Sequence, residues 1–414
     1  MTGSRAVLSA ALDRAAATIG ANAAAFGPLF PDDCAIDGVY RPRPPGAGQP
    51  TGGNHGWTTG FRTGLLWLAF QRAAQPDLRR AAQRDVASFS RRIDQRIDTD
   101  THDLGFLYSL SCVTAWQLTG DAAARRAGLR AADALLERVI EPAGVIQAWG
   151  DLSDPGQRGR TIIDSLMNTP LLWWASAVSG RPHYAAAAWR HVAQLRDHII
   201  RPDNTTFHTF WWRTDDGRPL GGTTQQGFSD ASCWARGQAW GIYGFTLNHV
   251  LSGDPSFLRA ARRCADHYLD RLPADGVPYW DLVFADGCDQ PRDTSAAAIA
   301  ACGLAELAAR VGPGDEGRRY RRAAEATAVA LARHHTPVPG RANALLLHGV
   351  YDWPKGVGVD QANLWGDYFY SEALTRLTAP GWTPYWLLGP GATPAASPAD
   401  TGRPVRQPVP GGDL

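Results

Sequence analysis

Helical segments of two kinds alternate along this chain, and their alternation limits the folds that it can adopt. One kind carries Ala, Leu and Val at three- and four-residue spacing, with Arg and Asp on the other face, which predicts half-solvated outer helices. The other kind is apolar or aromatic on most sides, which predicts buried helices. The outer segments are 121–139, 184–199, 256–272 and 317–335, and the buried segments are 60–70, 104–118, 163–177, 235–250, 295–309 and 365–377.

Six buried helices that alternate with outer ones predict an all-α fold, an (α/α)6 barrel of six helical hairpins closed in a ring. The residues at or near the starts of the six buried segments are Trp57, Asp103, Asp164, Arg236, Asp293 and Asp367. In such a ring the starts of the inner helices gather at one mouth, where free backbone N–H groups and positive dipole ends favour anions. We therefore expect a substrate carboxylate to suit that mouth.

The domain limits follow from the composition of three segments. Residues 1–27 have apolar stretches broken by Asp13 and Arg14, which predicts an amphipathic helix rather than a signal peptide. Residues 41–56 are rich in Pro and Gly and predict a loop over the rim of the barrel. Residues 389–414 form a tail rich in Pro, Gly and Ala, which cannot bury enough apolar surface to order itself. We therefore predict one barrel over residues 1–388, followed by a disordered tail.

Charge, hydropathy and cysteine content exclude several classes of partner. The 414 residues carry a net charge of +1, so no overall field attracts a polyanion and nucleic acid is not expected to bind. No apolar stretch approaches the ~20 residues of a membrane helix, so no membrane partner is expected. The six cysteines show no Cys-x-x-Cys spacing and are interpreted as reduced thiols. We expect a cytoplasmic protein, and the oligomeric state stays open.

Two aspartates stand where an unpaired carboxylate would be costly to bury. Asp103 precedes the apolar run 104–107, and Asp164 lies within the apolar run 162–167. A desolvated carboxyl has a raised pKa and holds a proton at neutral pH, whereas a second carboxyl in a wetter place stays ionised. The pair therefore predicts acid–base chemistry suited to a sugar. The structural alternative for each aspartate is a helix cap or an ion pair with an arginine.

Five motifs follow one another over nearly the whole chain. They are Trp57-Thr58-Thr59-Gly60-Phe61, His102-Asp103-Leu104-Gly105-Phe106-Leu107-Tyr108, Ile163-Asp164-Ser165-Leu166-Met167-Asn168, Trp234-Ala235-Arg236-Gly237-Gln238-Ala239-Trp240 and Trp365-Gly366-Asp367-Tyr368-Phe369-Tyr370. Together they resemble the unsaturated glucuronyl hydrolases, glycoside hydrolase family 88, over about residues 5–386. The family fold is an (α/α)6 barrel, which agrees with the helical pattern.

The resemblance implies an unusual glycoside hydrolase. Family members release a 4,5-unsaturated uronic acid from the non-reducing end of oligosaccharides that polysaccharide lyases produce. An aspartic acid protonates C4 of the ring double bond, water adds at C5, and the hemiketal opens and expels the rest of the saccharide. Asp164 matches the family's general acid and base. Asp103 matches the second essential carboxylate, which holds the sugar or stabilises positive charge at C5.

The resemblance also implies a set of substrate contacts. The matching residues are His102, His208, Gln226, Arg236 and Trp240, and the rings that can present flat faces to pyranoses are those of Trp57, Trp149 and Trp240. The planar fork of Arg236 suits the uronate carboxylate, with a buried ion pair as the structural alternative. His208 has a packed aromatic as its alternative, and Asp293 and Asp367 are interpreted as helix-start residues.

Departures from the family pattern bear on specificity. Members that accept sulfated fragments carry a Ser and, five residues later, a Lys before the last motif, and the matching places here are Asp352 and Val357. An Asp repels a sulfate, and only Lys355 lies close enough in the sequence to compensate, so a preference for sulfated substrates is not predicted. Gln225 stands where a His often precedes the matched Gln226, and Thr59 replaces a more polar residue.

Neither a metal nor an organic cofactor is expected, because the sequence has no His-x-x-x-His pair and no Gly-rich strand-to-helix turn. Three alternatives stay open. An unsaturated rhamnogalacturonyl hydrolase shares the barrel and the chemistry but acts on pectin fragments. A sugar epimerase on the same barrel would use His pairs at helix ends, which the single His208 and the two aspartates disfavour. A carbohydrate-binding protein without turnover would bind the same sugars.

Overall fold

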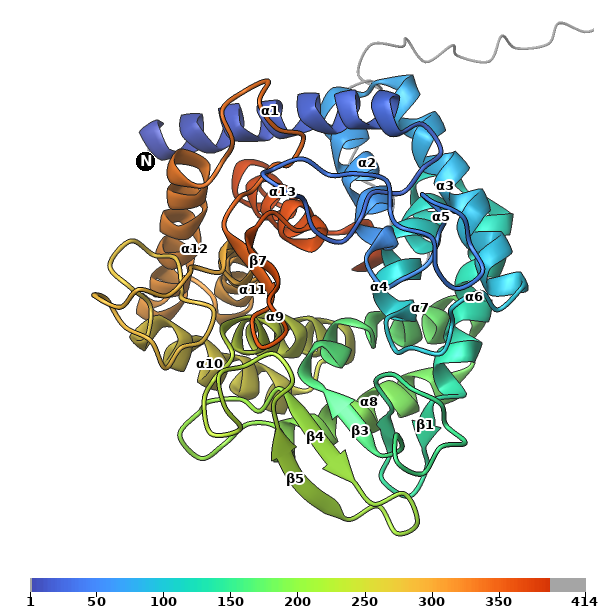
Figure 1. Ribbon diagram of the computed structural model, residues 1–414. Coiled ribbons are helices and arrows are strands. Elements are labelled where there is room, and N and C mark those ends of the chain that lie inside the picture. Colours follow the sequence, from blue (N-terminus) through green and yellow to red (C-terminus); the bar gives the residue numbers. More distant parts are fainter. Residues whose placement is uncertain (1, 388–414) are drawn as a thin grey trace, which may run out of the picture.

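Inner and outer helices alternate around a ring in the computed structural model, which describes residues 2–387 (Figure 1). The inner helices are α2 (Thr59–Ala73), α4 (Leu104–Tyr108) continued by α5 (Thr114–Thr119), α7 (Pro170–Ser179), α9 (Ala235–Ser252), α11 (Thr294–Val311) and α13 (Leu364–Thr378). The outer helices are α1 (Thr2–Phe26), α3 (Pro76–Asp94), α6 (Ala122–Leu136), α8 (Pro182–His198), α10 (Pro255–Asp270) and α12 (Asp315–His334). The predicted (α/α)6 barrel of six helical hairpins is confirmed.

The first helix of the chain closes the ring. The predicted amphipathic helix at the N-terminus is confirmed as α1, which buries Leu8, Leu12 and Ile19. It packs against α2, α12 and α13, so α1 and α13, from opposite ends of the described residues, form the sixth pair of outer and inner helices. Arg5 strengthens this closure by donating from Nη2 to the carbonyl oxygen of Thr378 at the end of α13, over 3.2 Å.

Burial separates the two layers as the hydrophobic pattern predicts. Residues 235–248 of α9 and 294–308 of α11 are all buried, whereas α3 buries one face. Helix α11 is long and apolar enough to cross a membrane by length and composition, but 83% of that window is buried inside the barrel, as expected of a core helix.

The connections at the two ends of the ring differ in length. An inner helix passes to its outer partner through a turn of two or three residues, as at Gly180-Arg181 and Gly253-Asp254. Gly180 and Gly253 have φ of 70° and 75°, which glycine adopts without a Cβ clash, and a proline then begins the outer helix. Every connection from an outer helix to the next hairpin is long. The long loops therefore all lie at the end where the inner helices begin.

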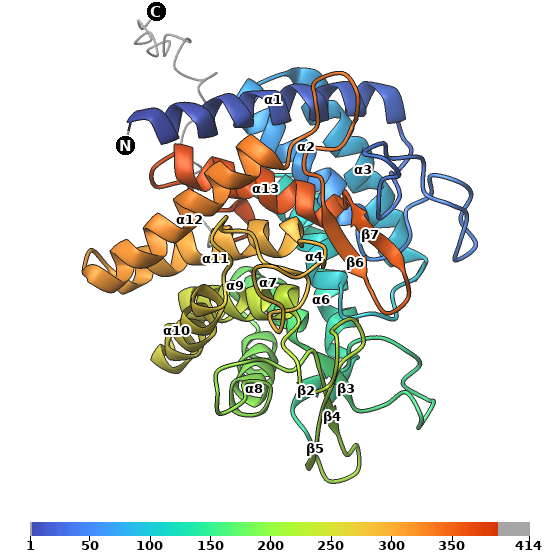
Figure 2. The ribbon, with the colours of Figure 1, turned by 60° about the vertical axis from the view of Figure 1, so that its left-hand side comes forward.

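Those long loops carry short strands that the sequence analysis did not predict. They are β1 (Val139–Ile140) with β2 (Val145–Ile146), β3 (Arg160–Ile162) with β4 (Thr209–Trp212) and β5 (Pro219–Thr223), and β6 (Gly349–Asp352) with β7 (Val357–Gln361). All three sheets are antiparallel. Figure 2 shows the strands and the loop before α2 on the same side of the helical ring. The predicted rim loop at 41–56 is confirmed as turns and isolated bridges.

Two predicted inner helices are interrupted. The segment 104–118 contains a π-helix, Ser109–Val113, between α4 and α5, where the Thr114 hydroxyl donates to the Ser109 carbonyl oxygen over 2.9 Å. The segment 163–177 starts as a 3₁₀ helix, Ile163–Met167, and α7 begins only at Pro170, whose missing N–H suits the first position of a helix. The predicted disordered tail at 389–414 lies outside the described residues.

A buried ionic cluster joins three inner helices. Arg376 of α13 donates from Nε to Glu372 Oε1 over 2.8 Å and from Nη2 to the Tyr243 hydroxyl of α9 over 2.6 Å. It also pairs with Glu306 of α11 over 2.5 Å. All of these side chains are buried, so Glu372 depends on the guanidinium for its charge balance, whereas Glu306 also pairs with Arg310 over 2.6 Å.

We expect Arg376→Met to lower the free energy of unfolding by about 3–5 kcal/mol, because it leaves the buried Glu372 without a cation and removes one of the two cations of Glu306. Urea unfolding followed by circular dichroism measures this loss. The matched control is Arg318→Met, which breaks an exposed pair with Asp315 and is expected to change stability by less than about 1 kcal/mol. Equal effects of the two substitutions would show that the cluster is not a main support of the ring.

Candidate active site

Asp164 enters the mouth of the barrel on a tight turn. Strand β3 ends at Ile162, and Asp164 is the second residue of the 3₁₀ helix that follows. The neighbours Ile163, Leu166 and Met167 are buried in the core, so the turn is anchored on apolar side chains. The Asp164 side chain is 15% exposed, and its Oδ1 has no hydrogen-bond partner among the described residues.

Asp103 occupies the N-cap position of α4 without capping it. Its side chain makes no hydrogen bond to the free N–H groups of the helix. Instead, the Thr101 hydroxyl donates to Asp103 Oδ2 over 2.7 Å. The alternative of a helix cap is therefore wrong for this carboxylate, which remains directed to the mouth of the barrel.

His102 lies between the two carboxyls. Its Nε2 is 3.4 Å from Asp103 Oδ1 and 3.5 Å from Asp164 Oδ1, and the side chain is 1% exposed. Burial lowers the pKa of His102 to about 3, with Arg138 adding to the effect, so the imidazole is neutral near pH 7. The ring therefore lies close to both carboxyls without contributing a positive charge that would hold both of them ionised.

Desolvation and mutual repulsion divide the roles of the two aspartates. Burial raises the pKa of Asp164 well above its usual value, and the nearby charge of Asp103 raises it further, while Arg236 partly opposes the rise. Burial also raises the pKa of Asp103 to about 6, opposed by hydrogen bonds from Thr101 and Asn168. Near neutral pH the pair therefore holds one proton, which resides on Asp164, and one negative charge, on Asp103.

The pair opens into a cavity of about 270 Å³ at the mouth of the barrel. The residues that line it are Trp57, Asp103, Trp149, Ile162, Asp164, His208, Gln225, Gln226, Trp234, Arg236, Trp240, Tyr351, Asp352 and Lys355. All the site residues that the sequence predicts are in this set except His102, which contacts both carboxyls from behind. The sequence analysis missed Trp234, although it lies inside a quoted motif, and Tyr351, which lies on β6 where no sequence signal marks it.

Arg236 forms the buried ion pair that was its structural alternative. Its Nη1 lies 3.0 Å from Asp293 Oδ2, with side-chain exposures of 2% and 0%. It also donates from Nη2 to the carbonyl oxygen of Tyr351 over 2.7 Å. Arg236 thus ties the start of α9 to α11 and to the β6–β7 hairpin. It still lines the cavity and acts on Asp164 through its charge.

The two aspartates interpreted as helix-start residues behave differently. Asp293 is the N-cap of α11 and accepts from the backbone N–H of Ser295 over 3.0 Å, so that prediction is confirmed. Asp367 lies in the first turn of α13, but Asn363 is the cap. The Asp367 carboxylate instead accepts from the backbone N–H groups of residues 345 and 346 and fixes the loop before β6, so a capping role is wrong for it.

His208 and Gln226 are held together in the wall of the cavity. The backbone N–H groups of Gln225 and Gln226 donate to His208 Nδ1 over 3.0 and 3.2 Å, so the proton of the ring resides on Nε2. Burial lowers the pKa of His208 to about 3, and the ring packs against Trp234 at 4.3 Å. Gln226 donates from Nε2 to the Tyr351 carbonyl oxygen over 3.0 Å, which leaves its own oxygen as an acceptor.

The three predicted tryptophan platforms are not equivalent. Trp57 donates from Nε1 to the Tyr351 hydroxyl over 2.9 Å and is half-buried, as is Trp149. Trp240 is only 1% exposed and packs against Phe106 and Phe369, so it belongs mainly to the core. Trp57 and Trp149 therefore have the more accessible rings.

His102, Asp103 and Asp164 also meet the geometric condition for holding a metal ion, since one ligand atom from each lies within 4.8 Å of the others. One imidazole and two carboxylates suit several divalent metals. Metal ligands must be deprotonated, however, and the environment of Asp164 favours its protonated form. The donor set therefore fits proton transfer better than metal binding, and the absence of a metal stays a prediction.

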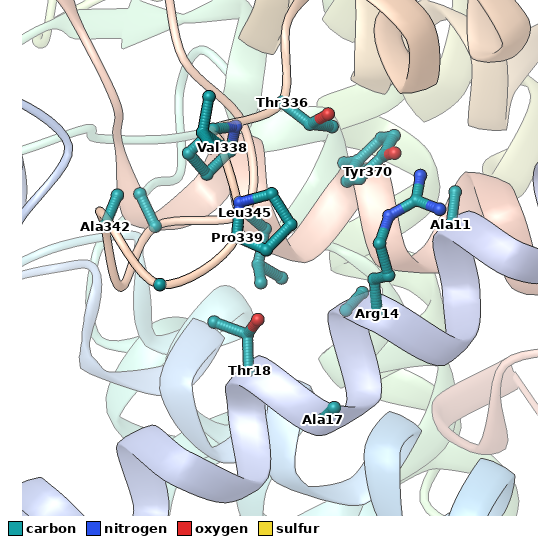
Figure 3. Close-up of a pocket in the computed structure, with 14 residues that line it drawn as sticks. Ala11, Arg14, Ala17, Thr18, Thr336, Val338, Pro339, Ala342, Leu345 and Tyr370 are labelled. Atoms are coloured by element: carbon teal, nitrogen blue, oxygen red, sulfur yellow. The ribbon is translucent and has the colours of Figure 1, made fainter.

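A second cavity lies away from this site, between α1 and the segment 336–345 (Figure 3). Its volume is about 200 Å³. Figure 3 shows Arg14 and Thr18 of α1 facing Pro339, with Tyr370 at one end. No carboxylate lines it, so it offers no acid–base pair.

Comparisons with known proteins agree with this geometry. Residues 47–384 match the family described as Glycosyl Hydrolase Family 88. A protein named unsaturated chondroitin disaccharide hydrolase, from Streptococcus pneumoniae, is 42% identical over 380 residues, which cover 91% of this chain and 93% of that protein. One named unsaturated glucuronyl hydrolase, from a Bacillus species, is 43% identical over 335 residues, which cover 80% of this chain and 89% of that protein.

Solved structures are similar over the same length. The crystal structure of unsaturated glucuronyl hydrolase from Streptococcus agalactiae has a TM-score of 0.87 and 40% identity, and covers 92% of this chain and 94% of that chain. A structure of an aspartate-to-asparagine variant of that enzyme, complexed with dGlcA-GalNAc6S, has a TM-score of 0.79 and 37% identity, with 92% and 93% coverage. The similarity therefore spans the ring of helices and the loops at its mouth.

We expect Asp164→Asn to stabilise the protein near pH 7, because burial raises the pKa of Asp164 well above its usual value. Asp164 keeps its proton in the folded state and loses it on unfolding, so wild-type stability falls as pH rises above the unfolded pKa. The amide carries no such proton, so the gap between variant and wild type shrinks as pH falls toward about 4. Urea unfolding of both proteins from pH 4 to pH 8 measures this difference in the free energy of unfolding.

The control is Asp215→Asn on the β4–β5 hairpin, for which the pH dependence of stability is expected to have the opposite sign. The hydrogen bond from Arg213 lowers the pKa of Asp215 to about 2. Any stabilisation from that carboxylate is present at neutral pH and is lost as pH falls. A gap for Asp164→Asn that stays constant with pH would contradict the raised pKa.

Proposed function

The chain belongs to glycoside hydrolase family 88, and we propose that it releases the 4,5-unsaturated uronic acid from the non-reducing end of glycosaminoglycan oligosaccharides by hydrating the C4=C5 bond. The observation that carries the proposal is the buried carboxyl pair, with its proton on Asp164 and its charge on Asp103. The relatives named for unsaturated chondroitin and glucuronyl substrates favour glycosaminoglycan fragments over the rhamnogalacturonan alternative.

The first step is proton transfer to carbon. The double bond joins C4 to C5, and C5 also carries the ring oxygen, so the ring is an enol ether. Asp164 gives its proton to C4, and positive charge develops on C5 and the ring oxygen. The Asp103 carboxylate, ionised at neutral pH and close to Asp164, stabilises that charge in a site of low dielectric.

The second step returns the proton. Asp164, now a carboxylate, takes a proton from a water molecule whose oxygen bonds to C5. The resulting hemiketal breaks its bond between C5 and the ring oxygen, which takes up a proton and leaves a keto group at C5. The hemiacetal that remains at C1 releases the rest of the saccharide as an alcohol. One water is consumed, and Asp164 ends protonated again, with a proton taken from that water in place of the one now bound to C4.

Substrate charge favours this cycle. A uronate carboxylate bound near Arg236 offsets the guanidinium charge, which in the free protein lowers the pKa of Asp164. The neutral imidazole of His208 offers Nε2–H as a donor to the sugar without adding a cation beside the proposed acid. Substrate binding is therefore expected to raise the Asp164 pKa further and to hold the acid ready.

We also propose that the reaction takes place in the cytoplasm. All six cysteines are free thiols and four of them are buried, which is usual for proteins of a reducing compartment.

Purified protein is expected to consume the double bond of unsaturated chondroitin and hyaluronan disaccharides, and to act at least about tenfold more slowly on the rhamnogalacturonan disaccharide. Loss of ultraviolet absorbance from the double bond measures each rate. The reverse preference would assign the chain to pectin fragments.

Asp164→Asn serves as the matched inactive variant. The amide keeps the shape of the carboxyl but cannot pass a proton, so turnover is expected to vanish while affinity stays within about tenfold of wild type. Calorimetric binding of the same disaccharide gives the affinity. Near wild-type turnover in this variant would remove Asp164 from the role of acid.

The pH dependence of kcat/KM is expected to be bell-shaped, and its acid limb reports Asp103. The rate falls below about pH 6 because Asp103, whose pKa is about 6, takes up a proton and no longer stabilises charge at C5. It falls at high pH when Asp164 loses its proton. Initial rates of Asp103→Asn across the same range provide the test, because that variant is expected to be slow and to lack the acid limb.

A further inference from the structure

Arg160 lies beside the cavity with its guanidinium between two tryptophan rings. It is on β3, directly opposite Trp211 of β4. Its Cζ is 4.0 Å from the ring centroid of Trp149 and 5.3 Å from that of Trp211. The rings restrict the plane of the guanidinium and place it one ring beyond the wall of the cavity, since Trp149 lines that wall.

No acidic side chain among residues 2–387 pairs with this cation. Its Nε is buried without a hydrogen-bond partner in that range. The two cations that line the cavity differ in this respect. Lys355 Nζ is 2.8 Å from Asp352 Oδ2, and Arg236 is held by Asp293. Lys355 is the residue whose position could compensate for the missing family lysine, but its charge is already paired with Asp352. Arg160 therefore carries the unpaired positive charge beside the cavity.

The position of Arg160 relative to the acid decides which part of a substrate it meets. Trp149 forms a backbone bridge with Thr101, whose side chain donates to Asp103. The unsaturated ring must place C4 and C5 at the carboxyl pair, and Trp149 lines the same cavity with a half-buried ring. A leaving sugar that packs on Trp149 would bring a group projecting beyond the edge of that ring to Arg160, whose Cζ is 4.0 Å from the ring centroid.

We propose that Arg160, held between Trp149 and Trp211, binds an anionic group on the saccharide that leaves, either a sulfate ester or the carboxylate of a following uronate. This inference rests on the proposed function. A planar guanidinium offers two parallel N–H donors to either anion, and its stacked position reduces the conformational entropy lost on binding. Desolvation by its neighbours disfavours the unpaired charge of Arg160, so an incoming anion gains more than it would at an exposed arginine.

The test compares three variants on four substrates. The variants are Arg160→Gln, which removes the charge, Arg160→Lys, which keeps the charge without the planar fork, and Arg213→Gln, the matched control in the turn between β4 and β5 of the same sheet. Arg213 is ion-paired with Asp215 and does not line the cavity. The substrates are the unsaturated chondroitin disaccharide without sulfate, its 4-sulfated and 6-sulfated forms, and the unsulfated tetrasaccharide, which carries a second uronate.

Arg160→Gln is expected to lower kcat/KM about tenfold, mainly through KM, for at least one of the three substrates with an extra anion, and to leave the unsulfated disaccharide within about twofold. Arg160→Lys is expected to recover part of the loss, and Arg213→Gln to behave as wild type. A loss on the sulfated disaccharides identifies a sulfate as the anion, and a loss on the tetrasaccharide identifies a carboxylate.

An equal loss on all four substrates would overturn the inference and make Arg160 a support for Trp149 alone, and no loss on any of them would overturn it as well. Failure of the proposed function is distinguishable, because it appears as wild-type protein that does not consume the unsulfated disaccharide. Calorimetric affinities for the same substrates can be measured in the Asp164→Asn background, with and without Arg160→Gln. They test, independently of turnover, whether Arg160 favours substrates with the extra anion over the unsulfated disaccharide.

Discussion

Desolvation of two neighbouring carboxyls is the constraint on which the rest of this site depends. Asp103 and Asp164 lie near enough to repel each other, and neither has an arginine or lysine as a direct partner among residues 2–387. Their environment therefore cannot hold two negative charges, and the proton that remains becomes the reagent. The neighbouring groups fit this requirement: His102 is neutral, and Arg236 is balanced by Asp293. An unpaired cation at either position would lower the pKa of Asp164 and favour loss of its proton.

The layout of the ring was predictable because its signals are local. Periodicity over ten to twenty residues separates the buried α9 and α11 from the one-sided α3, and the alternation of the two kinds implies a closed ring. The short strands were not predictable, since two to five residues carry too little pattern. The closure by α1 was also missed, because its partner α13 lies more than three hundred residues away.

Within the site, the sequence located residues better than it located their partners. All but one of the predicted site residues line the wall of one cavity, and His102 lies directly behind it. The partner of Arg236 could not be read from any motif, because Asp293 begins a different helix and the contact exists only when the ring closes. The same holds for Arg160, whose two tryptophans come from a loop and from β4.

A buried hydrogen-bond relay holds the turn that carries Asp164. The Ile146 N–H donates to His191 Nδ1 over 3.0 Å, so the His191 proton is on Nε2 and is donated to Ser165 Oγ over 2.7 Å. Ser165 in turn donates to the Ile162 carbonyl oxygen over 2.6 Å. Burial lowers the pKa of His191 to about 3, so the relay stays intact where the carboxyls change charge. The pH dependence of the reaction therefore reports the carboxyl pair and not a movement of the turn that carries it.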